Sequence, residues 1–280
     1  MTFKTYNGVA LPSFMYGTAW KKDDTARLVE LAVGAGFTAI DTANQLVHYN
    51  EALVGDALLA LAKRGVARDQ LFLQTKFTSV GGQRGNFPYD PKADLPTQVR
   101  QSFESSLKHL HTDRLDSYVL HGPYYRGGLG QEDWDVWGAI EEQYQAGKTR
   151  IVGVSNVSAG QLVELCEKAR VKPMVVQNRC YAAMAWDHEV RHVCAAHGLV
   201  YEGFSLLTAN PEVFGDPRFH AIAKRVGAGL PQVVFRFAQQ IGMLPLTGTT
   251  DAQHMKDDLA CDQFLLTPEE LRLIELISVA

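Results

Sequence analysis

One pattern repeats along the chain: a short apolar run typical of a β-strand, then a longer segment whose apolar residues recur at helical spacing. Eight runs are predicted as strands, spanning residues 14–17, 39–42, 71–76, 117–121, 151–155, 175–178, 200–204 and 244–247. Strands that alternate with helices form parallel sheets, and eight of them in about 250 residues is the content of a closed barrel. We therefore predict an α/β fold, a (β/α)8 TIM barrel in which residues 1–280 form a single domain.

Two features outside the barrel pattern refine this prediction. Asn7-Gly8 tolerates the positive φ of a tight turn and lies between two short β-rich runs, which predicts an N-terminal β-hairpin. A doubly wound sheet is the competing architecture, and it normally carries a GxGxxG turn after its first strand. None of the glycine-rich segments of this chain has that form between a strand and a helix, which favours the barrel.

Composition limits the partners of the chain. Of 280 residues, 46% are hydrophobic, enough for a large core, and 27 basic against 31 acidic residues give a formal charge of −4. This charge lacks the cationic field that nucleic acids require, and apolar runs fall short of the roughly 18 residues of a membrane span. We expect no nucleic acid and no membrane partner. The four widely spaced cysteines, Cys166, Cys180, Cys194 and Cys261, indicate free thiols in the reducing cytoplasm. The sequence predicts no oligomeric state.

Polar residues end five of the predicted strands. Asp41, Lys76 and His121 end the second, third and fourth strands, Ser155-Asn156 end the fifth, and Gln177-Asn178 end the sixth. Because the carboxyl ends of barrel strands converge on one mouth, we expect these side chains to meet there. Burial of an ionisable group is costly unless it is paired, so Asp41 and Lys76 are expected to form an ion pair across neighbouring strands.

A charged Lys76 would act on a nearby acid. Tyr49 follows the second strand, and an adjacent ammonium would lower the pKa of a phenol from its usual value of about 10. With His121 as a second hydrogen-bond donor, these residues would polarise and protonate a carbonyl oxygen. A reductant for the carbonyl carbon is not part of this set.

Four short motifs lie in order along most of the chain: Ile40-Asp41-Thr42-Ala43 with Asn50-Glu51 and Val54-Gly55, Leu71 to Lys76, Leu115 to Pro123, and Gly153-Val154-Ser155-Asn156. These motifs resemble those of the aldo-keto reductases. Each motif is short, but their order and spacing together are specific.

The resemblance implies a barrel that binds a nicotinamide dinucleotide at its strand ends, transfers hydride to a carbonyl carbon and protonates the oxygen from a tyrosine. By motif position, Asp41, Lys76 and His121 take the family's aspartate, lysine and histidine roles. Ser155, Asn156 and Gln177 would hold the carboxamide, and Phe204 stands where the family usually stacks a tyrosine on the nicotinamide. Further cofactor contacts are expected from Thr18, Ser205, Leu207, Thr247, Thr249, His254, Asp257 and Asp258.

The chain departs from the family pattern at two places. The usual tyrosine positions hold Leu46 and His48, so the acid role is assigned to Tyr49, with His48 as the alternative. In the phosphate clamp after the eighth strand, Leu246 replaces a lysine and His254 an arginine. NADPH remains the expected cofactor on family grounds, and NADH is the alternative.

The substrate is expected to be a small carbonyl compound. Long segments at residues 78–96 and 122–132 directly follow strands, where barrel loops form the walls of the active site. Trp20, Phe87 and Tyr124 are the expected apolar walls of the substrate pocket. No metal site is expected.

Three other functions stay open from the residues alone. His188-Glu189-Val190-Arg191-His192 matches the HExxH pattern of zinc proteases, although it falls on a helix that a barrel turns to solvent. Lys76 could form a Schiff base in a lyase, but a neighbouring carboxylate would oppose this by keeping the lysine protonated. A slow redox-sensing subunit that binds the nicotinamide cofactor is the third alternative, and its rate would distinguish it.

Overall fold

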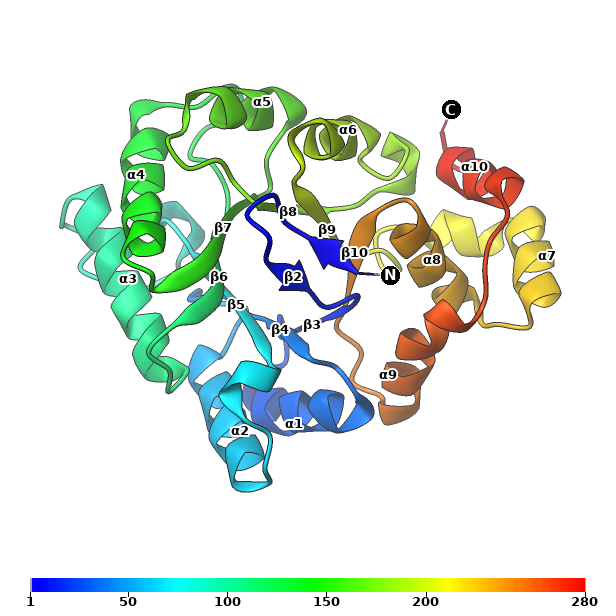
Figure 1. Ribbon diagram of the computed structural model, residues 1–280, viewed down its shortest axis with the longest axis horizontal. Helices are drawn as coiled ribbons and strands as arrows, with labels where there is room; N and C mark the ends of the chain where they lie inside the picture. The colour runs from blue at the N-terminus through cyan, green and yellow to red at the C-terminus, as the bar shows by residue number, and fades with distance from the viewer. Residues whose placement is uncertain (1, 280) are drawn as a thin grey trace.

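The computed structural model describes residues 2–279, and its centre is a closed barrel of eight parallel strands (Figure 1). The strands, in barrel order, are β10 (Met243–Thr247), β3 (Met15–Gly17), β4 (Ala39–Asp41), β5 (Phe72–Phe77), β6 (Leu115–Leu120), β7 (Thr149–Ser155), β8 (Val175–Arg179) and β9 (Val200–Phe204). Each of the eight predicted runs is a strand with its ends shifted by at most two residues. The (β/α)8 barrel prediction is therefore confirmed.

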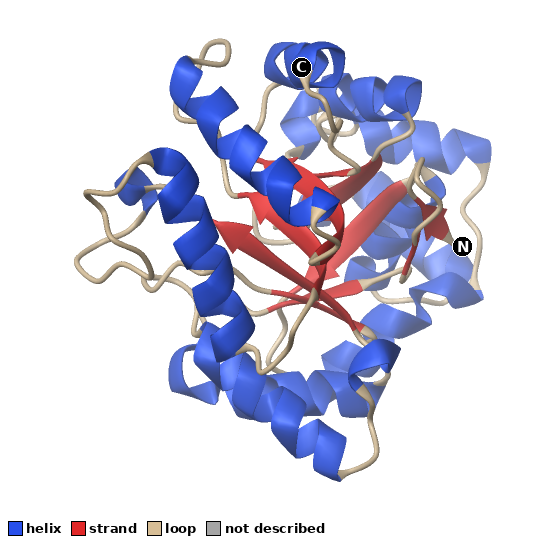
Figure 2. Cartoon of the chain, turned by 60° about the vertical axis from the view of Figure 1, so that its left-hand side comes forward, coloured by secondary structure: helices blue, strands red, loops and turns tan. Residues whose placement is uncertain are grey.

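Helices surround the barrel on its outside (Figure 2). They are α1 (Thr25–Ala35), α2 (Glu51–Lys63), α3 (Leu95–His109), α4 (Gln131–Gln145), α5 (Ala159–Lys168), α6 (His188–His197), α7 (Pro217–Val226), α8 (Leu230–Gln240), α9 (Ala252–Leu259) and α10 (Pro268–Leu276). The beginning of α7 has a local cause, because the Asp216 side chain accepts a hydrogen bond from Arg218 N and Pro217 occupies the first helical position.

The predicted N-terminal hairpin is present and lies across one end of the barrel (Figure 1). Its strands are β1 (Phe3–Lys4) and β2 (Ala10–Leu11), which are antiparallel. The turn is attached to the amino-terminal side of the sheet, because the Tyr6 hydroxyl donates to Lys172 O at 2.7 Å and Asn7 Nδ2 donates to Arg150 O at 3.2 Å. The hairpin therefore covers the end of the barrel opposite to the strand carboxyl ends.

The barrel interior contains polar side chains as well as apolar ones. Gln74, Lys76 and Glu202 have no exposed surface, and Asp41 is 3% exposed. Buried polar groups are retained only where hydrogen bonds replace water. Hydrogen bonds connect these four side chains, because Gln74 donates to both carboxylates and Lys76 donates to Asp41.

Within residues 2–279, no helix is both long and apolar enough to cross a membrane. The four cysteines are free thiols and all are buried.

Candidate active site

A cavity of about 560 Å³ opens at the carboxyl ends of the strands. Most of the residues expected from the sequence line it: Trp20, Asp41, Tyr49, His121, Ser155, Asn156, Gln177, Phe204, Ser205, Leu207, Thr247, Thr249, His254, Asp257 and Asp258. They come from β4, β7, β8, β9 and β10, from the loops that follow strands, and from α9. Side chains distant in the chain thus meet at one mouth, as barrel topology requires.

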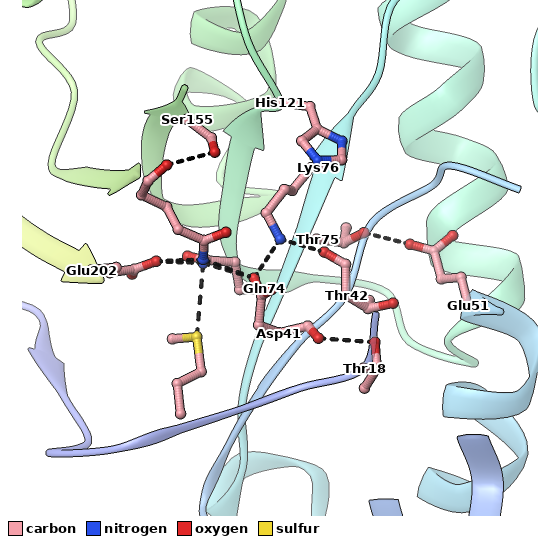
Figure 3. Close-up of polar contacts among 12 residues, drawn as sticks. Thr18, Asp41, Thr42, Glu51, Gln74, Thr75, Lys76, His121, Ser155 and Glu202 are labelled. Atoms are coloured by element: carbon pink, nitrogen blue, oxygen red, sulfur yellow. Dashed lines mark hydrogen bonds and ion pairs between the residues drawn. The ribbon is translucent and has the colours of Figure 1, made fainter. Parts of the chain in front are cut away.

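A buried ion pair lies at the base of the cavity. Lys76 Nζ donates to Asp41 Oδ1 at 2.6 Å and to Thr42 O at 2.9 Å, as Figure 3 shows. The two side chains are 0% and 4% exposed. Asp41 is held from the other side, because both the backbone N–H and the hydroxyl of Thr18 donate to Asp41 O. Thr18 is fully buried and, of the described residues, is not among those that line the cavity, so its observed contact is to Asp41.

Tyr49 is the side chain of its loop that faces this ion pair. The Lys76 ammonium lies 5.5 Å from the centroid of the Tyr49 ring, and the ring centroids of Tyr49 and His121 are 6.0 Å apart. His48 has a different partner: its ring lies against Trp20 with centroids 3.9 Å apart and the ring planes tilted by 36°, and Trp20 N donates to His48 O. Tyr49, and not His48, is therefore the side chain next to Lys76 and His121.

Neighbouring loops brace the segment that carries Tyr49. Tyr49 N donates to Gln45 O at 3.1 Å, and Gln45 Nε2 donates to Gly82 O at 2.9 Å. Gln83 adds two more contacts across the same gap, donating to Asn44 O and accepting from Leu46 N. The long segment after β5 therefore holds the tyrosine loop in place.

The protonation of Tyr49 differs from the expectation. Burial raises the pKa of the Tyr49 phenol above its usual range, and the nearby Asp41 carboxylate raises it further. The sequence predicts a lowered pKa from the adjacent ammonium. The reason for the difference is that Asp41 Oδ1, 2.6 Å from Lys76 Nζ, offsets most of the positive field of the ammonium. Burial therefore decides the direction of the Tyr49 pKa shift. Tyr49 is fully protonated at neutral pH.

His121 is neutral in this site. Burial, the Lys76 charge and His48 together lower the pKa of His121 to about 3. The His121 Nδ1 lies 2.7 Å from Thr78 Oγ1, a contact that fixes the ring. A neutral imidazole with one fixed nitrogen can donate or accept at the other, but it cannot supply a positive charge.

Three polar side chains form one wall of the cavity. Ser155 Oγ donates to Gln177 O at 2.6 Å, and Asn156 Nδ2 donates to His121 O at 2.7 Å. Asn156 has a φ of 53°, a left-handed conformation that asparagine tolerates better than most residues. Gln177 Nε2 donates to Asp41 Oδ1 at 3.1 Å. Ser155 Oγ also accepts from Asn156 Nδ2 at 3.1 Å. The amide oxygens of Asn156 and Gln177 receive no hydrogen bond from the described residues and remain as acceptors for a ligand.

The end of β9 contributes an aromatic ring. Phe204 is half-buried at the cavity, and the Arg179 guanidinium lies 5.6 Å from its ring centroid. Ser205 follows with a left-handed φ of 58°, so the chain turns sharply at the cavity rim. A flat ring placed in this way can stack against a planar ligand.

The far end of the cavity is built by β10 and α9. Thr247 Oγ1 donates to the buried Asp258 at 2.8 Å, and burial raises the pKa of Asp258 to about 6. Lys21, which the sequence analysis does not identify, also lines the cavity, and its ammonium contacts Gly248 O. Burial lowers the pKa of Lys21. The position of Lys21, directly after Trp20 at the end of the β3 loop, is the signal that could have identified it.

Two of the three expected substrate contacts lie elsewhere. Trp20 lines the cavity and is 65% exposed, whereas among the described residues Phe87 and Tyr124 are not part of the lining. Phe87 packs against Tyr89 with ring centroids 6.0 Å apart, and Tyr89 is anchored by its hydroxyl to Thr78 O. The loop folds back onto the core because its aromatic residues pack together there.

The HExxH segment faces away from the cavity. His188, Glu189 and His192 are exposed on α6, and the two imidazole rings stack on each other with centroids 6.3 Å apart. Within residues 2–279, no group of three or more metal-ligating side chains comes together. The segment therefore lacks the third ligand and the enclosed site that zinc chemistry uses.

Comparison with known proteins agrees with this geometry. The family model "Aldo/keto reductase family" matches residues 11–210. The chain is 28% identical to the glyoxal reductase of Bacillus subtilis, covering 99% of this chain and 92% of that protein. An aldo/keto reductase structure from Brucella melitensis superposes with a TM-score of 0.82 at 25% identity, covering 98% of each chain. A Bombyx mori aldo-keto reductase in complex with NADP superposes with a TM-score of 0.84 at 23% identity, covering 98% and 92%. The chain belongs to the aldo/keto reductase family, and it is an oxidoreductase that acts on carbonyl groups.

Proposed function

We propose that this protein reduces small aldehydes or ketones to alcohols with NADPH, and that Tyr49 is the general acid. The observation that carries the proposal is the buried Lys76–Asp41 pair, which lies 5.5 Å from the Tyr49 ring centroid at the base of the cavity, beside His121. A protonated phenol with a nearby ammonium is suited to give a proton to an oxygen that becomes negative.

The cavity suits a nicotinamide dinucleotide. Its volume of about 560 Å³ lies in the range of cofactor and ligand pockets. The amide nitrogens of Asn156 and Gln177 donate within the protein, so their oxygens would accept hydrogen bonds from a carboxamide, and the ring of Phe204 would stack on the nicotinamide. Leu246 stands where the family has a lysine, so one positive charge for the phosphate groups is missing there. The ammonium of Lys21 lines the cavity and supplies such a charge. When bound, the reduced dinucleotide supplies the hydride.

The protein side of the reaction follows from the protonation states. Tyr49 keeps its proton at neutral pH because burial and Asp41 raise its pKa, so it can donate to the substrate oxygen. The Lys76 ammonium then stabilises the phenolate that forms, and neutral His121 can donate a second hydrogen bond to the same oxygen. The exposed ring of Trp20 provides an apolar surface at the mouth.

The contacts of Lys76 do not favour Schiff-base chemistry. Its ammonium donates to Asp41 and Thr42, and the side chain has no exposed surface. A nucleophilic lysine must lose its proton and reach the substrate carbon. Neither requirement fits a lysine enclosed in an ion pair.

Two wider expectations accompany this function. We propose that residues 1–280 act as one domain, which the single closed barrel supports. We also propose the cytoplasm as its location, supported by the four buried free thiols, which persist in reducing compartments.

The test is a spectrophotometric assay of carbonyl reduction. Wild-type protein is mixed with NADPH or NADH and with a panel from small dicarbonyls to nitrobenzaldehyde, and loss of the reduced cofactor is followed. We expect turnover of roughly 1 per second or more with NADPH on at least one compound, and a lower KM for NADPH than for NADH. Turnover of about one per minute or slower on every compound would instead indicate the redox-sensing alternative.

A further inference from the structure

A second carboxylate lies inside the barrel, beneath the groups described above. Glu202 in β9 has no exposed surface. Its Oε2 accepts hydrogen bonds from Gln74 Nε2 at 2.7 Å and from Gln177 Nε2 at 2.9 Å. The same two amides also donate to Asp41 Oδ1, at 3.0 Å and 3.1 Å. Two glutamine amides therefore bridge Glu202 to the carboxylate that pairs with Lys76, and Figure 3 shows Gln74 between Glu202 and Asp41.

This arrangement determines how the Gln177 amide is turned. Its nitrogen donates to two carboxylate oxygens, so a flipped amide would place its own oxygen against both of them. Such a flip loses both hydrogen bonds, of which the one to Asp41 is charge-assisted, and adds repulsion between oxygens. Asp41 and Glu202 thus act together to keep the Gln177 nitrogen turned toward them, which leaves the oxygen as the group available to a ligand.

Glu202 also has one oxygen without a partner. Its Oε1 is buried and receives no hydrogen bond from the described residues. An unsolvated oxygen is more costly on a carboxylate than on a neutral carboxyl group. Burial, opposed by the hydrogen bonds from Gln74 and Gln177, raises the pKa of Glu202 to about 7. The side chain can therefore gain or lose a proton in the neutral range.

We propose that Glu202 is a positioning residue of the active site, which orients Gln177 toward the cofactor. In addition, the negative charge of ionised Glu202 acts on the linked Asp41–Lys76 pair and so weakens Tyr49 as an acid. The inference rests on the proposed carbonyl reduction and goes beyond it by assigning a role to a residue outside the cavity lining.

The charges around Glu202 set the direction of this effect. From β4 it faces Asp41, from β5 Lys76 and the neutral Gln74, and from β8 the neutral Gln177. Protonated Glu202 leaves Asp41 and Lys76 as a balanced pair. Ionised Glu202 adds a second negative charge to one ammonium, so less of its field remains to stabilise the phenolate of Tyr49. Carbonyl reduction should therefore slow as the pH rises through about 7.

The first test is the pH profile of kcat in Glu202→Gln. The wild type is expected to lose about tenfold in kcat between pH 6 and pH 8.5, a rise of about 1.4 kcal/mol in the activation barrier. Glu202→Gln keeps the shape and an accepting oxygen but cannot ionise, so its profile should be flat over that range. Glu141→Gln is the matched control, because Glu141 is an equally buried carboxylate that binds Arg170 far from the cavity. If Glu202→Gln keeps the wild-type decrease in kcat with pH, the ionisation of Glu202 does not cause it. The decrease would then come from another titrating group, such as Asp258.

The second test measures cofactor binding, which needs no turnover. Glu202→Met fills a similar volume without an acceptor, so Gln177 is held by Asp41 alone and the Kd for NADPH, followed by tryptophan fluorescence, should rise about tenfold. Glu202→Gln should stay within about threefold of the wild type because its oxygen still accepts. An unchanged Kd in Glu202→Met would overturn the positioning role.

A third readout separates this inference from the proposed function. Infrared titration of the protein without substrate should show a carboxylic-acid band that disappears near pH 7 in the wild type and is missing in Glu202→Gln. If the wild type reduces no carbonyl compound but shows this band, the proposed function fails and the ionisation of Glu202 stands. If carbonyl reduction is present but the band is the same in both proteins, the inference fails alone.

Discussion

Substitution of Asp41 by asparagine isolates the energetic contribution of the buried ion pair. The change leaves the Lys76 ammonium, which has no exposed surface, without a counter-charge at 2.6 Å. Breaking a buried pair by removing one partner costs about 3–5 kcal/mol of unfolding free energy. The asparagine oxygen retains the shape of Asp41 Oδ1 and can still accept from Gln74, so the loss reflects the charge and not the packing. We expect a destabilisation of about 4 kcal/mol.

Urea unfolding followed by tryptophan fluorescence measures this loss. In the double variant Asp41→Asn with Lys76→Met, no charge of the pair remains, so most of the stability should return while activity stays low. Glu142→Gln is the control, because its partner Arg100 lies 3.4 Å away with both side chains about half exposed, and we expect a cost below about 1 kcal/mol. A similarly small loss in Asp41→Asn would refute the reasoning.

Two further predictions concern packing and phosphate binding. Gly55→Ala should lower the free energy of unfolding by about 3 kcal/mol, because its Cβ would lie 1.8 Å from His109 O between α2 and α3. The control Gly160→Ala has open space around it and should be neutral or slightly stabilising. Equal stabilities of the two variants in thermal or urea unfolding would contradict the close approach. Lys21→Met should raise the Kd of both NADPH and NADH about tenfold, because the Lys21 ammonium would bind phosphates that both cofactors share. An unchanged Kd for both cofactors would show that Lys21 does not contact them.

The barrel and the meeting of its polar strand ends could be predicted from the sequence because both depend on periodicity. A strand alternates with a helix eight times, and the residue that ends a strand is identified by where the apolar run stops. This reasoning predicts Asp41 and Lys76 on neighbouring strands, and in the structure Lys76 Nζ lies 2.6 Å from Asp41 Oδ1.

Loop conformation and protonation could not be predicted in the same way. Phe87 and Tyr124 follow strands in the sequence, but the packing of the loops decides where they point, and no period encodes that packing. The direction of the Tyr49 pKa depends on whether Asp41 or Tyr49 lies closer to Lys76, which is a question of distance. Glu202 carried a visible signal, a single acidic residue within a buried strand, but its partners on β4, β5 and β8 appear only when the barrel closes.

The role of Tyr49 is the central claim, and single-turnover reduction by Tyr49→Phe tests it most directly. Protein saturated with NADPH is mixed rapidly with the best carbonyl substrate, and the rate of cofactor oxidation is compared with the wild type and with His48→Ala as the control. A general acid contributes about 100- to 10,000-fold, so we predict a loss of at least about 100-fold in Tyr49→Phe with a Kd for NADPH within about twofold of the wild type. A single-turnover rate in Tyr49→Phe equal to that of the wild type, with the loss appearing in His48→Ala, would contradict the account.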